Sequence, residues 1–358
     1  MRNRFIFPLL ALAVLFSLNR PISAKANSYT IKGDINADEA VTIEDAILLQ
    51  KWLSGDSETI LENWQAADLN QDGKLDGVDL CQIKIYLLTQ RETVHFSSPV
   101  CKAAAFASVS DKTLLYIDRI HERIAPASLT KLLTASVALH YLPPETVITV
   151  GTEQSLVKPR SSLCLIKQEH RLKLSDLLMG MLMASGNDAA YTVAAATART
   201  VKPETVMTDE QSVSFFTDLM NDYAVSIGMQ ESHFTTPDGW DDESQYTTVS
   251  DLLILAEHTL SIPILKEITG TYQKKVYFVS GENVTWTNTN ALLNPNSKYY
   301  CPDTFGVKTG TTSDAGNCLI AAFERNEKTY LSVVVGCATG NDRYELTLKM
   351  LSSFSCTD

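Results

Sequence analysis

The residues with the clearest chemical meaning are a serine and a lysine, Ser128 and Lys131, separated by two positions. Ser128 follows Pro126 and Ala127 and opens an apolar run with helical spacing, which puts Lys131 one turn away on the same face. A buried lysine beside other cations loses its proton readily and can accept the proton of a serine hydroxyl. The pair therefore predicts a serine nucleophile with a lysine base.

A second serine and lysine, Ser155 and Lys158, have the same spacing, so spacing alone is weak support. Lys158 is followed at once by Pro159, and a proline disfavours helix at the residue before it. We therefore assign the chemistry to Ser128 and expect no catalytic role for Ser155.

Two further short motifs follow in order, Ser185-Gly186-Asn187 and Lys308-Thr309-Gly310. The first ends an apolar helical run and would bring a hydroxyl and an amide to one wall of a cleft. The second precedes two strand-like runs, and a strand edge there can hold an extended peptide through backbone hydrogen bonds. Each motif alone is equally well explained by a helix cap or an ordinary turn. Their order after Ser128 and Lys131 favours one shared site.

The elements that would position these motifs alternate between strand-like and helical runs from about residue 100 onward. Strands are expected over 103–109, 113–117, 318–323 and 331–335, and helices over 128–141, 174–184, 215–227, 249–260 and 344–354. The last two strands, joined by residues 324–327, are typical of an antiparallel hairpin. The predicted fold class is α/β (α+β), an antiparallel sheet flanked by helices with a helical subdomain in the middle.

A duplicated acidic segment precedes this region: the stretch 33–38 returns thirty-four residues later as 67–72, and an amphipathic helix follows each copy. Oxygen-bearing side chains occupy positions 1, 3, 5 and 12 of each copy, and position 7 offers a backbone carbonyl, as in an EF-hand-like calcium loop. The expected ligands are Asp34, Asn36, Asp38, Ala40 and Asp45 in the first loop and Asp68, Asn70, Asp72, Lys74 and Asp79 in the second.

The alternative for these loops, a solvated Asp-rich turn, explains one copy but not two in register. Position 6, which favours a positive φ, is Gly73 in the second loop but Glu39 in the first, so the first loop departs from the pattern.

The duplication over residues 30–90 resembles the dockerin modules that attach secreted enzymes to cohesin domains of a scaffold. This resemblance implies a small all-α module, two structural Ca²⁺ sites and a cohesin partner. Positions 10 and 11 differ between the copies, which does not favour two equivalent binding modes. Residues 91–99 are expected to form a linker.

The region 100–358 resembles the low-molecular-mass penicillin-binding proteins, the serine-type D-Ala-D-Ala carboxypeptidases. The resemblance is carried by the stretches 125–131, 184–190 and 306–312, with Pro237-Asp238-Gly239 and 290–293 between them. It implies that Ser128 is acylated, that Lys131 is its base, and that Ser185 and Asn187 relay protons and contact substrate. The implied substrate-binding residues are Lys308, Thr309, Gly310, Thr311 and Arg343, with the backbone N–H groups of Ser128 and Thr311 as the oxyanion hole. A surface helix arginine is the alternative for Arg343.

The implied function is a secreted, penicillin-sensitive D-Ala-D-Ala carboxypeptidase that acts on peptidoglycan stem peptides and needs no catalytic cofactor. Two alternatives remain open, a D,D-endopeptidase of peptidoglycan cross-links and a non-catalytic module that binds muropeptides or β-lactams. A β-lactamase is disfavoured because the sequence has no Glu-x-x-Leu-Asn stretch, the usual source of its deacylating glutamate.

Composition and the N-terminal sequence indicate where the protein acts. The net charge of −12 without a basic run argues against nucleic acid as a partner. Arg2 and Arg4, an apolar stretch and Ala24-Lys25-Ala26 are typical of a signal peptide over 1–26. We therefore expect a secreted, extracellular or cell-surface protein with no membrane span after cleavage.

The sequence has seven cysteines, so at least one is unpaired within the chain, and Cys101 could be bridged to Cys356 or stay a free thiol.

Overall fold

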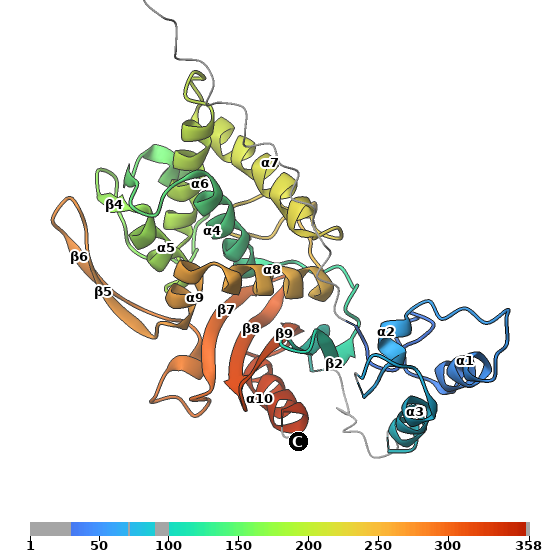
Figure 1. Ribbon diagram of the computed structural model, residues 1–358. Coiled ribbons are helices and arrows are strands. Elements are labelled where there is room, and N and C mark those ends of the chain that lie inside the picture. The colour runs from blue at the N-terminus through green and yellow to red at the C-terminus, as the bar shows by residue number, and fades with distance from the viewer. Residues whose placement is uncertain (1–29, 71, 90–99, 356–358) are drawn as a thin grey trace, which may run out of the picture.

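The computed structural model describes residues 30–70, 72–89 and 100–355 (Figure 1). The signal peptide predicted over 1–26 and the linker predicted over 91–99 lie outside these ranges. Within the described ranges, no helix combines the length and the apolarity that a bilayer-spanning helix requires. Residues 30–89 are called the N-terminal module below, and residues 100–355 the C-terminal domain.

The N-terminal module contains the helices α1 (Ile43–Leu53), α2 (Trp64–Ala67) and α3 (Gly77–Thr89). Its core is small and made of Ile35, Ala46, Leu49, Ala67 and Ile83. Each predicted calcium loop leads directly into a long helix, α1 or α3. The first of these helices begins with a capping box between Thr42 and Asp45, which satisfies backbone N–H groups that would otherwise lack a partner.

The C-terminal domain is built on a five-stranded antiparallel sheet with the strand order β2-β1-β9-β8-β7. Its strands are β1 (Ala103–Ser108), β2 (Thr113–Asp118), β7 (Thr304–Thr312), β8 (Gly316–Arg325) and β9 (Lys328–Cys337). Asn326 and Glu327 both have positive φ in the turn between β8 and β9, which suits the right-handed twist of a hairpin. The predicted antiparallel sheet and terminal hairpin are confirmed.

Alternate residues of β1 show that both faces of the sheet are covered. Ala103, Ala105 and Ala107 join the large core that includes the helical region. Ala104 and Phe106 join a second core with the helix α10 (Asp342–Phe354). Figure 1 shows α10 on one side of the sheet and α8 across the other. The sheet thus forms the middle layer between the helical region and α10.

The helical region lies between β2 and β7 in the sequence. It contains α4 (Thr130–Tyr141), α5 (Leu174–Leu182), α6 (Asn187–Val201), α7 (Asp209–Ile227), α8 (Val249–Ser261) and α9 (Pro263–Gly270). The same region contains the short 3-10 helices η2 (Ala127–Leu129), η3 (Thr152–Leu156) and η4 (Ala291–Leu293). It also contains two small two-stranded sheets. One pairs β3 (Val147–Thr149) with β4 (Arg171–Lys173), and the other pairs β5 (Gln273–Tyr277) with β6 (Asn283–Thr287).

Two of these helices, α6 and α9, were not predicted. Residues 187–195 of α6 are all buried, so this alanine-rich helix has no alternation between a polar and an apolar face in its first half. The short helix α9 begins at Pro263, a residue that fits the first position of a helix but not its interior. With eight residues, α9 is also shorter than the window of about 11–18 residues over which helical periodicity is read.

The cysteine pairing differs from the one considered from the sequence. Cys101 is bonded to Cys337, so the bridge from Cys101 to Cys356 is wrong. The physical reason is strand pairing: β1 runs antiparallel to β9, and the backbone N–H of Lys102 donates to the carbonyl of Val335. This register brings the start of β1 to the end of β9. Free thiols remain at Cys81, which is exposed, and at the buried Cys164, Cys301 and Cys318.

Candidate active site

Ser128 lies in a strained turn just before a buried helix. It belongs to η2, and α4 begins two residues later at Thr130, so the helix starts slightly after the predicted position. The preceding residue, Ala127, has a φ of 48°, a conformation that costs energy for a residue with a Cβ atom. A Cβ added at Gly310 of β7 would lie 3.2 Å from the backbone N of Ser128. Strand β7 therefore packs directly against the serine turn.

Lys131 is completely buried and points at the serine. Its Nζ lies 2.7 Å from Ser128 Oγ and donates a second hydrogen bond, of 2.8 Å, to the backbone carbonyl of Asp238. Burial lowers the pKa of Lys131 to about 8, although the carboxylates of Asp238 and Asp188 oppose this shift. Roughly a tenth of this lysine is therefore neutral at pH 7 and able to accept a proton.

Ser185 and Asn187 face this pair from the junction of α5 and α6. Ser185 has a φ of 59°, and its Oγ accepts a hydrogen bond of 3.0 Å from Lys308 Nζ. Asn187 Nδ2 donates to Asp238 Oδ2 at 2.5 Å. The capping alternative does not hold for either side chain, because the N-cap of α6 is Gly186 and no side chain caps the helix.

Lys308 lies on β7 within the same buried cluster. Burial, followed by the charges of Lys131 and Arg343, holds the pKa of Lys308 well below its ordinary range. Its neighbour Thr309 shares a hydrogen bond of 2.6 Å with the hydroxyl of Thr289.

Arg343 reaches from the start of α10 to the end of β7. Its Nη1 donates to the carbonyls of Gly310 and Cys318 and to the hydroxyl of Thr311, each at 3.2 Å. Arg343 is partly exposed, and these contacts join the last helix to the strand that carries Lys308. The three sequence motifs and Arg343 therefore meet around β7.

Sequence reasoning assigned no role to two buried carboxylates of the site. Asp238 contacts both Lys131 and Asn187, and Pro237-Asp238-Gly239 was noted only as part of a resemblance. Asp188 accepts hydrogen bonds from the backbone N–H groups of Cys164, at 2.9 Å, and Ile166, at 3.2 Å. It thereby ties the loop 157–167 to the residues beside Asn187. An aspartate in the first turn of a helix is common, so the sequence offered no separate signal for it.

A cavity of about 440 Å³ lies under this loop, with Asp188 in its wall. Lys158, Arg160 and Lys167 also line it, and none of the three is ion-paired within the part of the chain that the structure describes. Ser155 and Lys158, the second pair with nucleophile-like spacing, are both exposed. They lack the burial that lowers the pKa of Lys131.

The two predicted calcium loops have nearly the same internal hydrogen bonds. Asp45 accepts from the N–H groups of Ile35 and Thr42, and Asp79 accepts from the equivalent N–H groups of Leu69 and Asp76. In the described ranges no three His, Cys, Asp or Glu side chains converge as a metal site by themselves. Each loop would therefore depend on its asparagine and backbone oxygens as well as on its aspartates, a donor set that suits calcium.

Charge crowding in the first loop also fits a cation. Burial, and then the nearby carboxylates of Asp45 and Asp38, raise the pKa of Asp34, while backbone hydrogen bonds oppose this shift. A divalent cation relieves this kind of repulsion between carboxylates. The residues present therefore fit calcium, with Asp34, Asn36, Asp38, Ala40 and Asp45 as the holders in the first loop and Asp68, Asn70, Asp72, Lys74 and Asp79 in the second.

The geometry of the C-terminal domain fits a class of protein, the active-site-serine enzymes, with a buried lysine beside the serine hydroxyl. Comparison with known proteins gives the family. Residues 96–339 match the D-alanyl-D-alanine carboxypeptidase family, Peptidase S11, and residues 32–88 match the dockerin type I domain. The chain belongs to the D-alanyl-D-alanine carboxypeptidase family and carries a dockerin type I module before the catalytic region.

Among curated relatives, the carboxypeptidase DacF of Bacillus subtilis is 28% identical over 253 residues, 70% of this chain and 61% of its own. DacD of Escherichia coli is 30% identical over 240 residues, 64% of this chain and 57% of its own. The chain thus spans about six-tenths of the length of these relatives.

Two solved structures extend the comparison. The Streptomyces K15 DD-transpeptidase superimposes with a TM-score of 0.67 at 25% identity and covers 74% of this chain and all of its own. Penicillin-binding protein D2 of Listeria monocytogenes, in its ampicillin-bound form, has a TM-score of 0.58 at 26% identity and covers 72% of this chain and 98% of its own. The penicillin-binding fold expected from the sequence is confirmed.

Proposed function

We propose that this protein is a secreted serine D-Ala-D-Ala carboxypeptidase that removes the terminal D-Ala of peptidoglycan stem peptides. One observation carries the proposal: Lys131 is buried, has a pKa lowered to about 8, and lies 2.7 Å from the hydroxyl of Ser128. The catalytic region is residues 100–358, and residues 30–90 form a separate docking module. Family membership supports the reaction type.

Acylation begins when Ser128 Oγ attacks the carbonyl carbon of the penultimate D-Ala and passes its proton to neutral Lys131. The oxyanion that forms accepts hydrogen bonds from the backbone N–H groups of Ser128 and Thr311. The C–N bond then breaks, and the leaving amine takes a proton relayed by Lys131 and Ser185. D-Ala departs, and an ester joins the remaining peptide to Ser128.

Water completes the reaction by attacking the ester carbonyl and giving a proton to Lys131. The C–O bond to Ser128 breaks, the serine recovers a proton, and the shortened peptide leaves as a carboxylate. Up to the departure of D-Ala, Lys308 and the hydroxyl of Thr309 hold the terminal carboxylate of the substrate, beside Gly310 and Arg343, and they would hold the carboxylate of a β-lactam in the same way. Asn187 holds the substrate amide from the opposite wall.

The charge around the site supports an acidic peptide as substrate. The chain carries a net charge of −12, yet the cavity beside Asp188 presents Lys158, Arg160 and Lys167 without anionic partners in the described ranges. Unpaired cations grouped in an acidic protein attract anionic ligands. Peptidoglycan stem peptides carry carboxylates upstream of D-Ala-D-Ala, so these cations suit that part of the substrate.

The test is D-alanine release from a peptide ending in D-Ala-D-Ala, with fluorescent penicillin as an active-site label. We expect Ser128→Ala to lower release at least about a thousandfold and to abolish labelling. Ser155→Ala is the matched control, because it removes a serine with the same spacing to a lysine, and it should keep both signals. Release that persists in Ser128→Ala would remove Ser128 as the nucleophile.

The alternative functions differ from a carboxypeptidase in the group that accepts the acyl chain, in the group that leaves, or in having no turnover. The structural neighbour from Streptomyces is described as a DD-transpeptidase, in which an amine rather than water would take the acyl group. Labelling without D-alanine release from the free peptide, together with cleavage of cross-linked dimers, would indicate a D,D-endopeptidase. Labelling without any turnover would indicate a muropeptide or β-lactam binding module.

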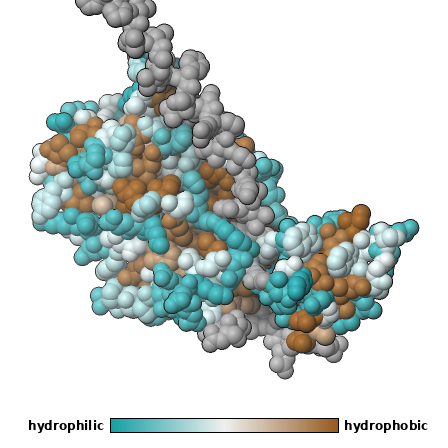
Figure 2. Space-filling model, in the orientation of Figure 1, coloured by the Kyte–Doolittle hydropathy of each residue, from teal (hydrophilic) through white to brown (hydrophobic). Residues whose placement is uncertain are grey.

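The N-terminal module is proposed to bind two structural Ca²⁺ ions and a cohesin domain of a scaffold protein. Its helices expose large apolar side chains, and Figure 2 shows hydrophobic residues gathered on the surface of this module. These side chains include Ile43, Ile47, Trp52, Trp64 and Val78. A small module with such an exposed surface is expected to cover it with a partner. Binding to cohesin that is lost on calcium chelation would support this role.

A further inference from the structure

Glu39 occupies a position in the first calcium loop that costs backbone energy. It has a φ of 69°, and the equivalent residue of the second loop, Gly73, has a φ of 77°. The two loops thus have the same backbone conformation at this point, which glycine adopts without the strain that a residue with a Cβ atom meets there. A glutamate at this position is explained if its side chain makes a contact that glycine cannot make.

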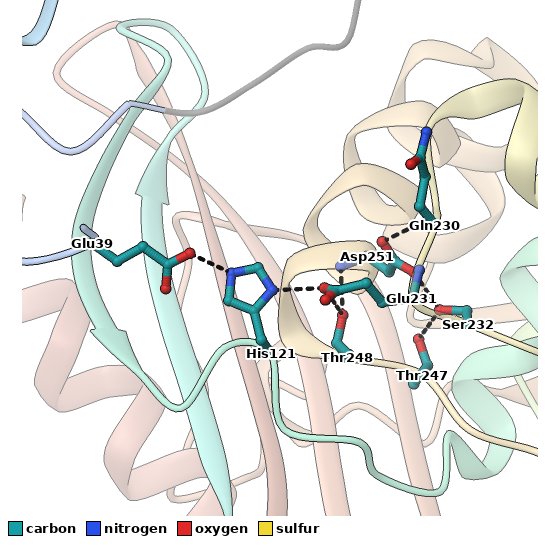
Figure 3. A network of polar contacts seen from close by, with 8 residues as sticks. All are labelled: Glu39, His121, Gln230, Glu231, Ser232, Thr247, Thr248 and Asp251. Atoms are coloured by element: carbon teal, nitrogen blue, oxygen red, sulfur yellow. Dashed lines mark hydrogen bonds and ion pairs between the residues drawn. The ribbon is translucent and has the colours of Figure 1, made fainter. Parts of the chain in front are cut away.

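The contact of Glu39 lies in the C-terminal domain (Figure 3). Glu39 Oε1 is 2.7 Å from His121 Nε2, and the other ring nitrogen of His121 lies 2.6 Å from Glu231 Oε2. Burial alone would lower the pKa of His121, but the hydrogen bond and charge of Glu231, with those of Glu39, raise it overall. Each ring nitrogen thus faces a carboxylate from a different part of the chain, and when the imidazole is protonated both nitrogens can donate.

Glu231, the second carboxylate in contact with His121, is held in place by hydrogen bonds within the C-terminal domain. The backbone N–H of Glu231 donates to Asp251 at 2.8 Å, and the hydroxyl of Ser232 donates to the same oxygen at 2.6 Å. Thr248, the N-cap of α8, places its hydroxyl 3.4 Å from Glu231 Oε2 (Figure 3). His121 therefore meets a carboxylate whose backbone is fixed by neighbouring hydrogen bonds.

A second attachment lies just before the same loop. The backbone N–H of Thr30 donates to the carbonyl of Lys112, and the carbonyl of Thr30 accepts from the N–H of Leu114, both at 3.0 Å. Thr30 thereby pairs with β2, the edge strand of the sheet. Only three residues separate Thr30 from Asp34, the first expected calcium ligand. The loop is therefore attached to the C-terminal domain both just before its first residue and at Glu39.

We infer that the first calcium loop fastens the N-terminal module to the C-terminal domain through Glu39, His121 and Thr30, so that calcium binding and this attachment favour each other. The coupling follows because calcium orders the loop backbone that presents Glu39, and each of two linked equilibria favours the other by the same factor. The second loop has glycine at position 6, so the coupling belongs to the first loop alone. The inference rests on the calcium binding proposed above.

The experiment uses the full chain and compares Glu39→Gln with Glu44→Gln. Both variants remove one negative charge from the same loop region, but only Glu39 contacts His121. His121→Gln removes the other partner, and Glu39→Gly restores the glycine of the pattern. Calorimetry measures calcium binding, and hydrogen–deuterium exchange at Leu114 and its neighbours on β2 measures attachment with calcium or with a chelator.

In the wild type, calcium should slow exchange at Leu114 about fivefold or more, and Glu44→Gln should retain this protection. Glu39→Gln, Glu39→Gly and His121→Gln should bind calcium but lose the protection. Calcium binding in the wild type without any change at β2, or equal behaviour of Glu39→Gln and Glu44→Gln, would overturn the inference alone. Absence of calcium binding in the wild type would overturn both the inference and the proposed calcium sites.

Discussion

Two buried lysines set the chemistry of the site at the scale of single residues. Lys131 and Lys308 have lost almost all contact with solvent, and their pKa values are lowered by this burial. Charged groups are rarely buried without a partner, because removing a charge from water is costly. Burial lowers the pKa of Lys131 although the carboxylates of Asp238 and Asp188 lie nearby, so the lysine beside the Ser128 hydroxyl loses its proton more readily than a lysine in water.

The rate of acylation should therefore rise with pH through the pKa of Lys131. With a pKa of about 8, roughly a tenth of Lys131 is neutral at pH 7 and most of it near pH 9, so the rate constant should rise about tenfold between them. The second-order rate constant for labelling by fluorescent penicillin measures this. Lys131→Arg should remove the rise, because a guanidinium stays protonated at every pH used. A flat wild-type profile from pH 6 to pH 10 would count against Lys131 as the base.

At the scale of elements, the serine turn is held in place by close backbone packing. A Cβ added at Gly239 would lie 1.7 Å from the carbonyl oxygen of Ala127, and Gly310 of β7 approaches the same turn from another side. Backbone atoms cannot move aside as the end of a side chain can. The strained turn is thus kept in shape by the loop that carries Asp238 and by β7.

Gly239→Ala should displace the serine turn. We expect labelling by penicillin to slow at least about a hundredfold, since small shifts of reacting groups cost this much. Gly281→Ala is a matched control, because Gly281 also has a positive φ, of 108°, but no atom lies within 4 Å of its added Cβ. That control should lose only about 1 kcal/mol of unfolding free energy and keep its labelling rate. Equal labelling rates in the two variants would show that the close contact is not needed.

At the scale of the whole molecule, one covalent bond joins the two ends of the C-terminal domain. The disulfide between Cys101 and Cys337 closes a loop with a sequence separation of 236. It links β1, near the start of the domain, to β9, just before the last helix. A disulfide of this kind fits the oxidising environment outside the cell in which the protein is proposed to act.

Removing this disulfide should lower stability by acting mainly on the unfolded chain. For the double variant Cys101→Ser and Cys337→Ser we expect a loss of about 2–5 kcal/mol in unfolding free energy, because the unfolded state regains conformational freedom. Denaturation by guanidinium chloride measures the change. The exposed free thiol of Cys81 supplies the control, since Cys81→Ser should alter stability by less than about 0.5 kcal/mol. A double variant as stable as the wild type would contradict this account.

Local patterns in the sequence were sufficient to predict the helix after Ser128, the terminal hairpin and the two Asp-rich loops. The helical run after Ser128 put Lys131 on the same face as the serine. Two nearly continuous apolar runs, joined by residues 324–327, gave the β8–β9 hairpin. Asp-rich spacing gave both loops of the N-terminal module. Each of these features depends on neighbours in the chain, so their physical causes are readable from short windows of sequence.

Contacts between distant segments were decided only by the tertiary structure. Asp238 reaches Asn187 and Lys131 because the loop before α8 packs against the start of α4, and Cys101 meets Cys337 because β1 pairs with β9. The contact between Glu39 and His121 likewise depends on how the N-terminal module sits on the C-terminal domain. No short window contains both partners of such a contact. The sequence determined which groups could react, and the packing of the chain determined which are buried, which are charged and which meet.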